Sequence, residues 1–366
     1  MNESQLLQTL ALQKVSKIGD ITAKKLIHHC GSVEGIFKEK KESLLKIDGF
    51  GKSILEDLFN TGNLKRAEDE LRFIKNNGIQ WHYFMDDSYP DRLKHCIDGP
   101  ILLFQKGQIN IQQQPIISIV GTRSISSHGI DFCENLIEHL APFNPIIVSG
   151  FAYGTDITAQ KAALKHNLQT IGCLAHGFDQ IYPKIHKKYV KSVERYGGFF
   201  TDFWSTDNFD RNNFLKRNRI IAGLSEATII IESAEKGGSL VTADIALSYN
   251  REVFAVPGRP SDAQSIGCNN LIKLHRAHVL SQAEDIPYIL NWKNKMESAS
   301  QQKKIFIDLD KDEQLVLDFL KDNGKSLLDI IALKTDMPTY RIATLLLNLE
   351  LKDLVRPLPG KLFESI

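Results

Sequence analysis

Three glycine-containing segments each follow a short apolar run and precede a helical pattern. They are Gly121-Thr122-Arg123-Ser124, Ser149-Gly150-Phe151-Ala152-Tyr153-Gly154-Thr155-Asp156 and Gly237-Gly238-Ser239-Leu240. Glycines let backbone N–H groups approach a ligand closely, and the N-terminus of a helix favours negative charge. The three segments therefore predict a binding site for a phosphate group.

The common nucleotide-binding motifs are absent from these segments. The first one is not G-x-G-x-x-G, and Ser149-Gly150 ends the second apolar run where an acidic ribose ligand would be expected. The chain also contains no G-x-x-x-x-G-K-[ST] motif. We therefore expect neither NAD, FAD nor a P-loop ATPase, and no cofactor at all.

Two basic segments flank the glycine-containing ones. They are Tyr182-Pro183-Lys184-Ile185-His186-Lys187-Lys188 and Arg211-Asn212-Asn213-Phe214-Leu215-Lys216-Arg217-Asn218-Arg219. With Arg123 they would place several cations around a phosphate site, and Phe214 offers a ring on which a base could stack. This combination is typical of a groove for single-stranded nucleic acid. A solvated helix face remains the alternative for the lysines at 187, 188 and 191.

The elements that position these segments are short apolar runs alternating with helical stretches. The runs are Ile116–Val120, Ile146–Val148, Thr170–Leu174, Phe199–Thr201, Thr228–Ile231 and Val253–Val256. Their residues do not alternate with polar ones, which indicates strands buried on both faces of a parallel sheet. We predict a Rossmann-like, doubly wound and mostly parallel α/β domain, with its ligand site at the carboxyl ends of the strands.

The N-terminal part of the chain predicts short helices separated by glycine turns. The segment Ile47–Ile54 resembles a helix-hairpin-helix, in which glycines admit a phosphate. Residues Ile18–Ala23 look like a second copy, with Lys17 in the place of the first glycine. DNA binding by these turns and a purely structural role in a helical, SAM-like domain both stay open.

The C-terminal part predicts a winged helix. Three helical patterns, at about 311–322, 326–334 and 338–351, precede a hairpin at 355–363. Residues 305–366 carry 8 basic and 11 acidic side chains, a net charge of −3. Because this charge disfavours DNA, we expect the module to contact a protein. The predicted organisation is a helical domain at 1–64, the Rossmann-like domain at 65–290, a polar linker at 291–304 and the winged helix at 305–366.

Composition limits the function classes. The 366 residues include 45 basic and 44 acidic side chains, so any nucleic-acid footprint must be local. Five widely spaced cysteines without a C-x-x-C pair argue against a disulfide framework and a zinc site. No signal peptide and no apolar run of ~20 residues is present. We expect a cytoplasmic protein with no metal and no membrane partner.

Several motifs, in one order, resemble the DNA-processing protein A family (DprA, also called Smf). They are Arg217–Ser225, Gly238–Ala243, Val253–Gly258 and Ser265–Ile272, preceded by the Gly-Thr-Arg turn, the second glycine-containing segment and Tyr182-Pro183. The resemblance covers about residues 70 to 290 strongly. The N-terminal module and the C-terminal winged helix resemble optional domains of the same family.

The resemblance implies a protein that is not an enzyme. Members of this family bind single-stranded DNA, form a homodimer through the extended Rossmann domain, and load the RecA recombinase onto DNA during natural transformation. By matching motif, the implied DNA-binding residues are Gly121, Thr122, Arg123, Ser149, Gly150, Gly154, Lys184, Arg211, Phe214, Arg217, Asn218, Arg219, Gly238 and Ser239.

Two alternatives belong to other classes. A Rossmann-like nucleoside-monophosphate phosphoribohydrolase uses P-G-G-x-G-T-x-x-E, whereas residues Gly237–Asp244 keep only the first glycine pair and end in the shorter aspartate. A lost reach of about 1 Å costs on the order of a hundredfold in rate, which disfavours the enzyme. The other alternative, a protein adaptor acting through the winged helix, predicts no DNA binding.

Overall fold

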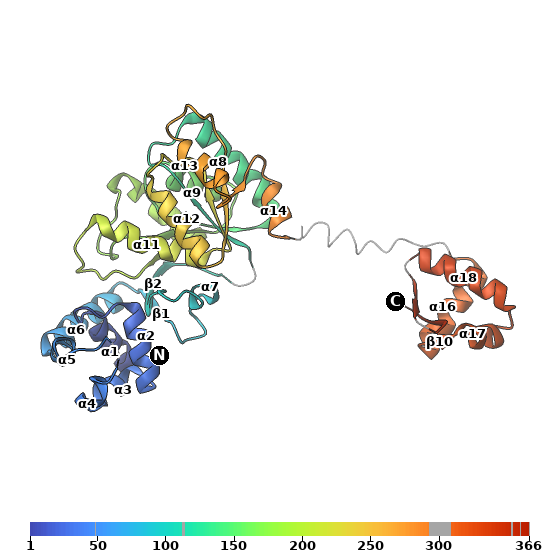
Figure 1. Cartoon of the computed structure of the whole chain (residues 1–366), viewed down its shortest axis with the longest axis horizontal. Coiled ribbons are helices and arrows are strands. Elements are labelled where there is room, and N and C mark those ends of the chain that lie inside the picture. Colours follow the sequence, from blue (N-terminus) through green and yellow to red (C-terminus); the bar gives the residue numbers. More distant parts are fainter. Residues whose placement is uncertain (48, 112–113, 293–308, 353, 359, 366) are drawn as a thin grey trace. The chain divides into compact units, whose positions relative to one another are not determined.

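The computed structural model describes residues 1–47, 49–111, 114–292, 309–352, 354–358 and 360–365. It divides into two compact units, Met1–Lys295 and Met296–Ile366. Figure 1 shows the first unit with its helices and sheet and the second with the C-terminal helices. Apart from its first two residues, the linker expected at 291–304 lies outside the described residues.

The first unit is built on one mixed sheet. In the described part of the chain its strand order is β1-β2-β6-β5-β4-β3-β7-β8-β9. The strands are β1 (Gln80–Tyr83), β2 (Leu102–Gly107), β3 (Ile116–Val120), β4 (Ile146–Ser149), β5 (Thr170–Cys173), β6 (Gly197–Thr201), β7 (Ala227–Ile230), β8 (Glu252–Ala255) and β9 (His278–Val279). The apolar runs correspond to β3–β8, which are parallel to one another, so the predicted fold class is confirmed. The antiparallel strands β1, at the edge of the sheet, and β2, beside it, were not predicted.

The direction of winding reverses between β3 and β7. From β3 the chain adds β4, β5 and β6 on one side, and it then returns to add β7, β8 and β9 on the other. In doubly wound sheets, ligands bind at the carboxyl ends of the strands beside such a reversal. The glycine-containing segments that follow β3, β4 and β7 all lie at this edge.

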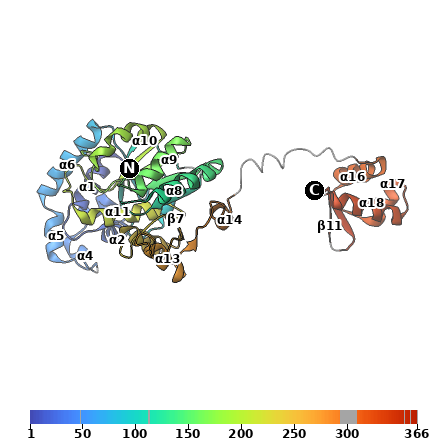
Figure 2. The same cartoon turned by 90° about the horizontal axis from the view of Figure 1, so that it is seen from above.

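Helices cover both faces of the sheet, as Figure 2 shows from above. Ile117 and Ile119 of β3 pack against α8 (Ser127–Leu140) and α9 (Thr155–Lys165). Ile116 and Val120 belong to the opposite core, with α11 (Arg211–Leu224) and α12 (Gly238–Ser248). Successive strand residues point to opposite faces, and both faces are dry, which explains the unbroken apolar runs. The shorter helical elements of this unit are α7 (Asp91–Lys94), η1 (Ala141–Phe143), η2 (Lys184–Tyr189), α10 (Val190–Tyr196), α13 (Ile266–Lys273) and α14 (Asp285–Ile289).

The N-terminal helices share a hydrophobic core with β1 and β2. They are α1 (Glu3–Gln13), α2 (Asp20–Cys30), α3 (Val33–Lys38), α4 (Lys41–Leu44), α5 (Lys52–Leu58) and α6 (Thr61–Asn76). Their core includes Leu102 and Phe104 of β2 and Trp204, which follows β6. Helix α6 crosses the predicted domain boundary at 64/65, so that boundary falls inside a helix.

The two N-terminal turns have the same backbone form. Gly49 has a φ of 81°, and Lys17 has a φ of 67° at the equivalent position of the first turn. Gly51 and Gly19 are then the N-caps of α5 and α2. This repeat supports the interpretation of residues 18–23 as a second hairpin, although Asp48 of the other hairpin lies outside the described residues.

The second unit has the predicted order of a winged helix. Its elements are α16 (Lys311–Asn323), β10 (Ser326–Leu327), α17 (Leu328–Thr335), α18 (Thr339–Leu351), β11 (Val355–Leu358) and β12 (Leu362–Ser365). Arg341 on α18 forms an ion pair with Asp312, and Lys352 forms one with Glu313. These pairs neutralise cations that a DNA-reading helix would present to phosphate.

The five cysteines are free thiols, and Cys30 is the one that is not buried. Among the described helices, none is both long enough and apolar enough to span a bilayer. Within the same residues, no group of three or more histidine, cysteine or acidic side chains could hold a metal ion.

Candidate nucleic-acid interface

A cavity of about 420 Å³ lies at the winding reversal of the sheet. Its walls are the segments after β3, β4 and β7 together with the first half of α11. Most of the predicted site residues line it: Gly121, Thr122, Arg123, Arg211, Phe214, Arg217, Asn218, Gly238 and Ser239. The structure therefore brings the three glycine-containing segments and the second basic segment to one place.

Three other predicted residues hold these loops together from beneath. The Ser149 hydroxyl is buried and donates a 2.6 Å hydrogen bond to the Ile119 carbonyl oxygen. Gly154 has a φ of +72°, and a Cβ there would lie 2.3 Å from the Thr122 carbonyl oxygen. Gly150 likewise has no room for a side chain. These residues shape the cavity without lining it.

Arg217 lies in the floor of the cavity, and it is only 4% exposed. Its Nη1 donates to the carbonyl oxygen of Gly150 at 2.6 Å and also to that of Cys173. A Cβ on Gly150 would lie 2.3 Å from this nitrogen and 2.5 Å from Oδ2 of Asp156. Burial raises the pKa of the Asp156 carboxyl, and the positive charge of Arg217 opposes that rise. Arg217 thus joins the ends of β4 and β5.

Arg123 and Arg211 lie at the rim of the same cavity, and both are exposed. The Arg123 guanidinium lies 5.0 Å from the centre of the Phe214 ring. Neither arginine forms an ion pair with a carboxylate of the described residues. Two unneutralised guanidinium groups therefore face solvent beside the glycine-containing loops, which suits phosphate.

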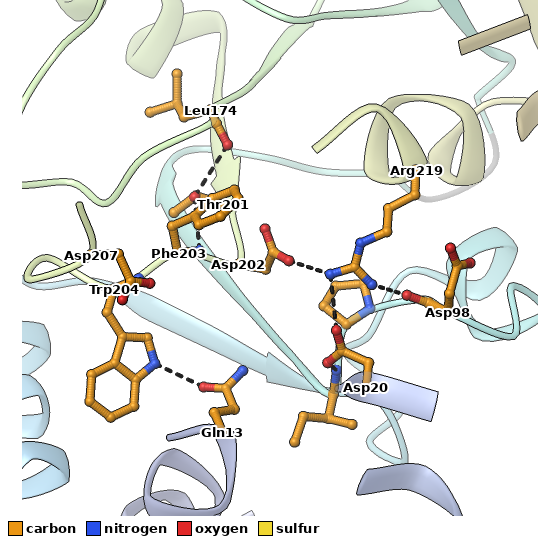
Figure 3. A network of polar contacts seen from close by, with 12 residues as sticks. Gln13, Asp20, Asp98, Leu174, Thr201, Asp202, Phe203, Trp204, Asp207 and Arg219 are labelled. Atoms are coloured by element: carbon orange, nitrogen blue, oxygen red, sulfur yellow. Dashed lines mark hydrogen bonds and ion pairs between the residues drawn. The ribbon is translucent and has the colours of Figure 1, made fainter. Parts of the chain in front are cut away.

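Arg219 does not line the cavity, although it was predicted at the same site. Figure 3 shows its guanidinium between Asp20 of α2 and Asp202, which follows β6; the distance to Asp20 is 3.0 Å. It also donates to the Asp98 carbonyl oxygen. The carboxylates raise the pKa of Arg219 despite its burial. This side chain connects the N-terminal helices to the sheet.

The helix geometry explains why Arg217 and Arg219 separate. Two residues along an α-helix differ in direction by about 200°, so the two side chains leave opposite sides of α11.

Two other predicted features also lie away from the cavity lining. Lys184 is exposed at the start of η2 and does not line the cavity. The turn of the first N-terminal hairpin is also engaged, since Asp20 accepts a 2.8 Å hydrogen bond from the Ile101 amide. This contact favours a structural role for that hairpin.

Three aromatic residues that the sequence analysis did not assign form a cluster with Phe214. Tyr182 and Phe209 lie with their ring centres 5.8 Å and 5.5 Å from that of Phe214, and 4.7 Å from each other. Tyr153 lies 6.5 Å from Tyr182. Tyr182 stands in a basic segment that the analysis had singled out, but nothing in the spacing links Phe209 or Tyr153 to it.

Two buried histidines hold the segment that carries Tyr182. His176 Nε2 accepts a 3.2 Å hydrogen bond from the Tyr182 amide, so Nδ1 donates to the Gly177 carbonyl oxygen at 2.8 Å. His186 Nδ1 donates to the Phe151 carbonyl oxygen at 3.0 Å. Burial lowers the pKa of both imidazoles. Each ring is thus suited to the neutral form in its present contacts.

The hydrolase alternative lacks its carboxylate in this geometry. Asp244, which replaces the required glutamate, forms a 2.6 Å ion pair with Arg276 and lies outside the cavity. Within the described chain, the acidic side chain that lines the cavity is Asp156, and it accepts the Ala152 amide at 3.3 Å. The carboxylate at the position of the hydrolase's glutamate therefore does not line the cavity.

Comparison with known proteins identifies relatives of this chain. Residues 80–291 match the family model for DNA recombination-mediator protein A, and residues 305–361 match the DprA winged helix domain. The protein Smf of Synechocystis sp. is 30% identical over 286 residues, which are 77% of this chain and 72% of that relative. DNA processing protein DprA of Streptococcus pneumoniae is 35% identical over 202 residues, which are 55% of this chain and 71% of that relative.

Solved structures are similar as well. The X-ray structure of DNA processing protein A from Streptococcus pneumoniae superposes with a TM-score of 0.65 at 26% identity, covering 80% of this chain and 99% of that one. A structure of DNA processing protein A from Helicobacter pylori, described for its single-stranded DNA binding mode, superposes with a TM-score of 0.52 at 27% identity. The match covers 58% of this chain and 96% of that one. From the doubly wound sheet, the loops at its winding reversal and these matches, we conclude that the chain belongs to the DNA recombination-mediator protein A (DprA/Smf) family.

Proposed function

We propose that this protein binds single-stranded DNA at the cavity beside β3 and β7 and acts in the processing of DNA taken up during natural transformation. The observation that carries the proposal is the pair of exposed, unneutralised guanidinium groups of Arg123 and Arg211 at the rim of a cavity made of glycine-containing loops. The single-stranded DNA binding described for the Helicobacter pylori relative supports it.

The start of α12 offers a second type of phosphate contact. Its N-cap is Gly237, so no side chain caps the first amide groups, and the space beside Gly238 is open. Uncapped amides at a helix N-terminus attract anions. A phosphate between this helix and Arg123 would meet both backbone donors and a forked guanidinium.

The proposal includes partners that family membership suggests. The protein would form a homodimer and deliver the bound strand to RecA, without catalysing a reaction itself. The winged helix would contact a protein, because its net charge is negative and its α18 cations are paired.

Fluorescence anisotropy with a labelled oligonucleotide tests the DNA-binding proposal. We expect tight binding to the single strand and much weaker binding to the duplex at matched salt, since no helix in the site presents a row of base-reading side chains. Equal affinity for both forms would contradict the proposal, and no binding to either would favour the alternative of a protein adaptor.

A truncated chain tests the role of the winged helix. A chain ending at Lys295, which keeps the first compact unit, should retain most of the affinity for the single strand.

A further inference from the structure

Four aromatic side chains form a continuous cluster at the rim of the cavity. We call Tyr153, Tyr182, Phe209 and Phe214 the aromatic ledge. Successive ring centres lie 6.5 Å, 4.7 Å and 5.5 Å apart along this order. The rings come from three separate segments, which follow β4, β5 and β6 and include the start of α11. Tertiary folding alone brings them together.

The rings of the ledge differ in what they can offer to a ligand. Phe214 is partly buried, and the guanidinium carbons of Arg123 and Arg217 lie 5.0 Å and 6.0 Å from its ring centre. Its remaining ring contacts are the steep, edge-type ones with Tyr182 and Phe209. Phe214 therefore lines the cavity, and its ring packs against the Arg123 guanidinium at the rim.

Two rings of the ledge are exposed, one on the segment after β4 and one on the segment after β6. Tyr153 is 43% exposed and Phe209 is 44% exposed. Exposed aromatic rings gathered beside a cavity indicate a binding surface, since each leaves a large apolar area in water. The rings are also held in place: His186 packs 5.3 Å from Tyr153, and His176 accepts the backbone amide of Tyr182.

The charges around the ledge identify its occupant. Arg211 lies two residues after Phe209, and Lys184 lies two residues after Tyr182. Both are exposed, and neither forms an ion pair with a described carboxylate. Rings flanked by free cations match a strand whose bases stack and whose phosphates are neutralised. A protein partner with an apolar surface would leave these cations without counter-charges.

We infer that bases of a single strand stack on Phe209 and Tyr153 as the strand leaves the cavity, beside the Phe214 ring that packs against Arg123. The inference rests on the proposed function and extends it, because it assigns the bases to two residues that are not among the implied DNA-binding residues. Stacking on rings tolerates any base. The ledge therefore adds affinity without sequence preference.

The test compares variants of the full chain on two oligonucleotides of equal length. One is an ordinary single strand, and the other carries abasic sites, which keep the phosphates and remove the bases. Phe209→Ala and Tyr153→Ala should each weaken binding of the ordinary strand by about 5- to 150-fold, the loss expected for one stacked base. On the abasic strand the same variants should bind as the unchanged protein does, and the dependence of affinity on salt should not change.

Matched controls separate stacking from other effects. Tyr288 is an exposed tyrosine on α14 outside the ledge, 87% exposed, so Tyr288→Ala should leave binding unchanged. Tyr153→Phe keeps the aromatic ring and should retain affinity for the single strand. Phe209→Leu keeps an apolar side chain but has no π face, so it should lose affinity as Phe209→Ala does.

The outcomes distinguish this inference from the proposed function. If the unchanged protein binds the ordinary strand, but Phe209→Ala and Tyr153→Ala behave like Tyr288→Ala, the ledge is not a stacking surface and the proposed function stands. A loss of equal size on both oligonucleotides would also overturn the ledge, because the contact would then not involve bases. If the unchanged protein binds no single strand, the proposed function itself fails.

Discussion

The first turn of α11 and its middle carry the same residue type for opposite purposes. Arg211 is exposed at the cavity rim, without an ion pair among the described residues. Arg217 is buried, and its guanidinium donates to two carbonyl oxygens. The ion pairs of Arg219 join two parts of the fold. A basic segment that resembles one binding motif thus contains an exposed arginine available to a ligand and two arginines engaged within the fold.

The difference follows from the cost of burying charge. An exposed guanidinium keeps its hydration and is free to meet a phosphate. A buried one is stable only when acceptors or carboxylates replace the water. Removing the first kind should therefore change affinity, whereas removing the second should change stability.

The largest loss of stability is expected for Arg217→Ala. The substitution leaves the Gly150 and Cys173 carbonyl oxygens without their donor and Asp156 without its counter-charge. We expect a loss of about 3–5 kcal/mol in the free energy of unfolding, as for a broken buried pair. Urea denaturation measures it, with Arg211→Ala as the control, for which a change within about 0.5 kcal/mol is expected. Equal losses for both variants would break the comparison.

The next largest effect should come from Arg219→Ala. It leaves the Asp20 and Asp202 carboxylates facing each other at the contact between α2 and the sheet, where the Asp202 side chain is only 9% exposed. We expect a loss of about 1–3 kcal/mol in unfolding free energy. Adding Asp202→Asn should recover part of it, because the repulsion is removed. A double variant as unstable as the single one would show that repulsion plays no part.

Arg123→Ala tests the exposed side of the comparison. Because this guanidinium is at the cavity rim without a carboxylate partner among the described residues, its loss should leave unfolding free energy within about 0.5 kcal/mol. The slope of log affinity against log salt should fall by ~0.7, the value for one phosphate contact on a single strand. Anisotropy titrations over a range of salt measure the slope. An unchanged slope would mean that Arg123 contacts no phosphate.

His176 extends the comparison to a buried basic group that the fold keeps neutral. Its pKa is lowered from about 6.5 by burial, with Arg217 acting in the same direction and Asp179 in the opposite one. The unfolded chain therefore binds the proton more readily, and stability should be full above pH 6.5 and fall as the pH drops through that value. The loss is about 1.4 kcal/mol for each unit of pKa shift.

The measurement is the unfolding free energy of the unchanged protein and of His176→Gln at pH 7.5 and pH 5. Glutamine does not titrate in this range, and its amide oxygen can accept the Tyr182 N–H. The variant should therefore lose less stability between the two pH values. An identical loss in both proteins would assign the pH dependence to other groups.

The main sheet, the winged helix and the place of the candidate site could all be predicted from the amino-acid sequence. Strands β3–β8 are recognisable because residues buried on both faces must all be apolar. The glycine-containing loops are recognisable because each stands between a buried strand and a helix, and parallel strands bring their carboxyl ends to one edge. The edge strand β1 escaped prediction because its four residues, Gln80–Tyr83, are mostly not buried.

Which basic and aromatic residues face the cavity could not be predicted from the sequence, because it depends on tertiary contacts. Arg217 and Arg219 differ by two positions and therefore point to different sides of α11. Whether each side meets solvent, a carbonyl oxygen or a carboxylate depends on segments far away in the chain, such as Gly150 and Asp20. The ledge has the same origin, because Tyr153 and Phe209 become neighbours of Tyr182 only when the loops after β4, β5 and β6 meet at the edge of the sheet.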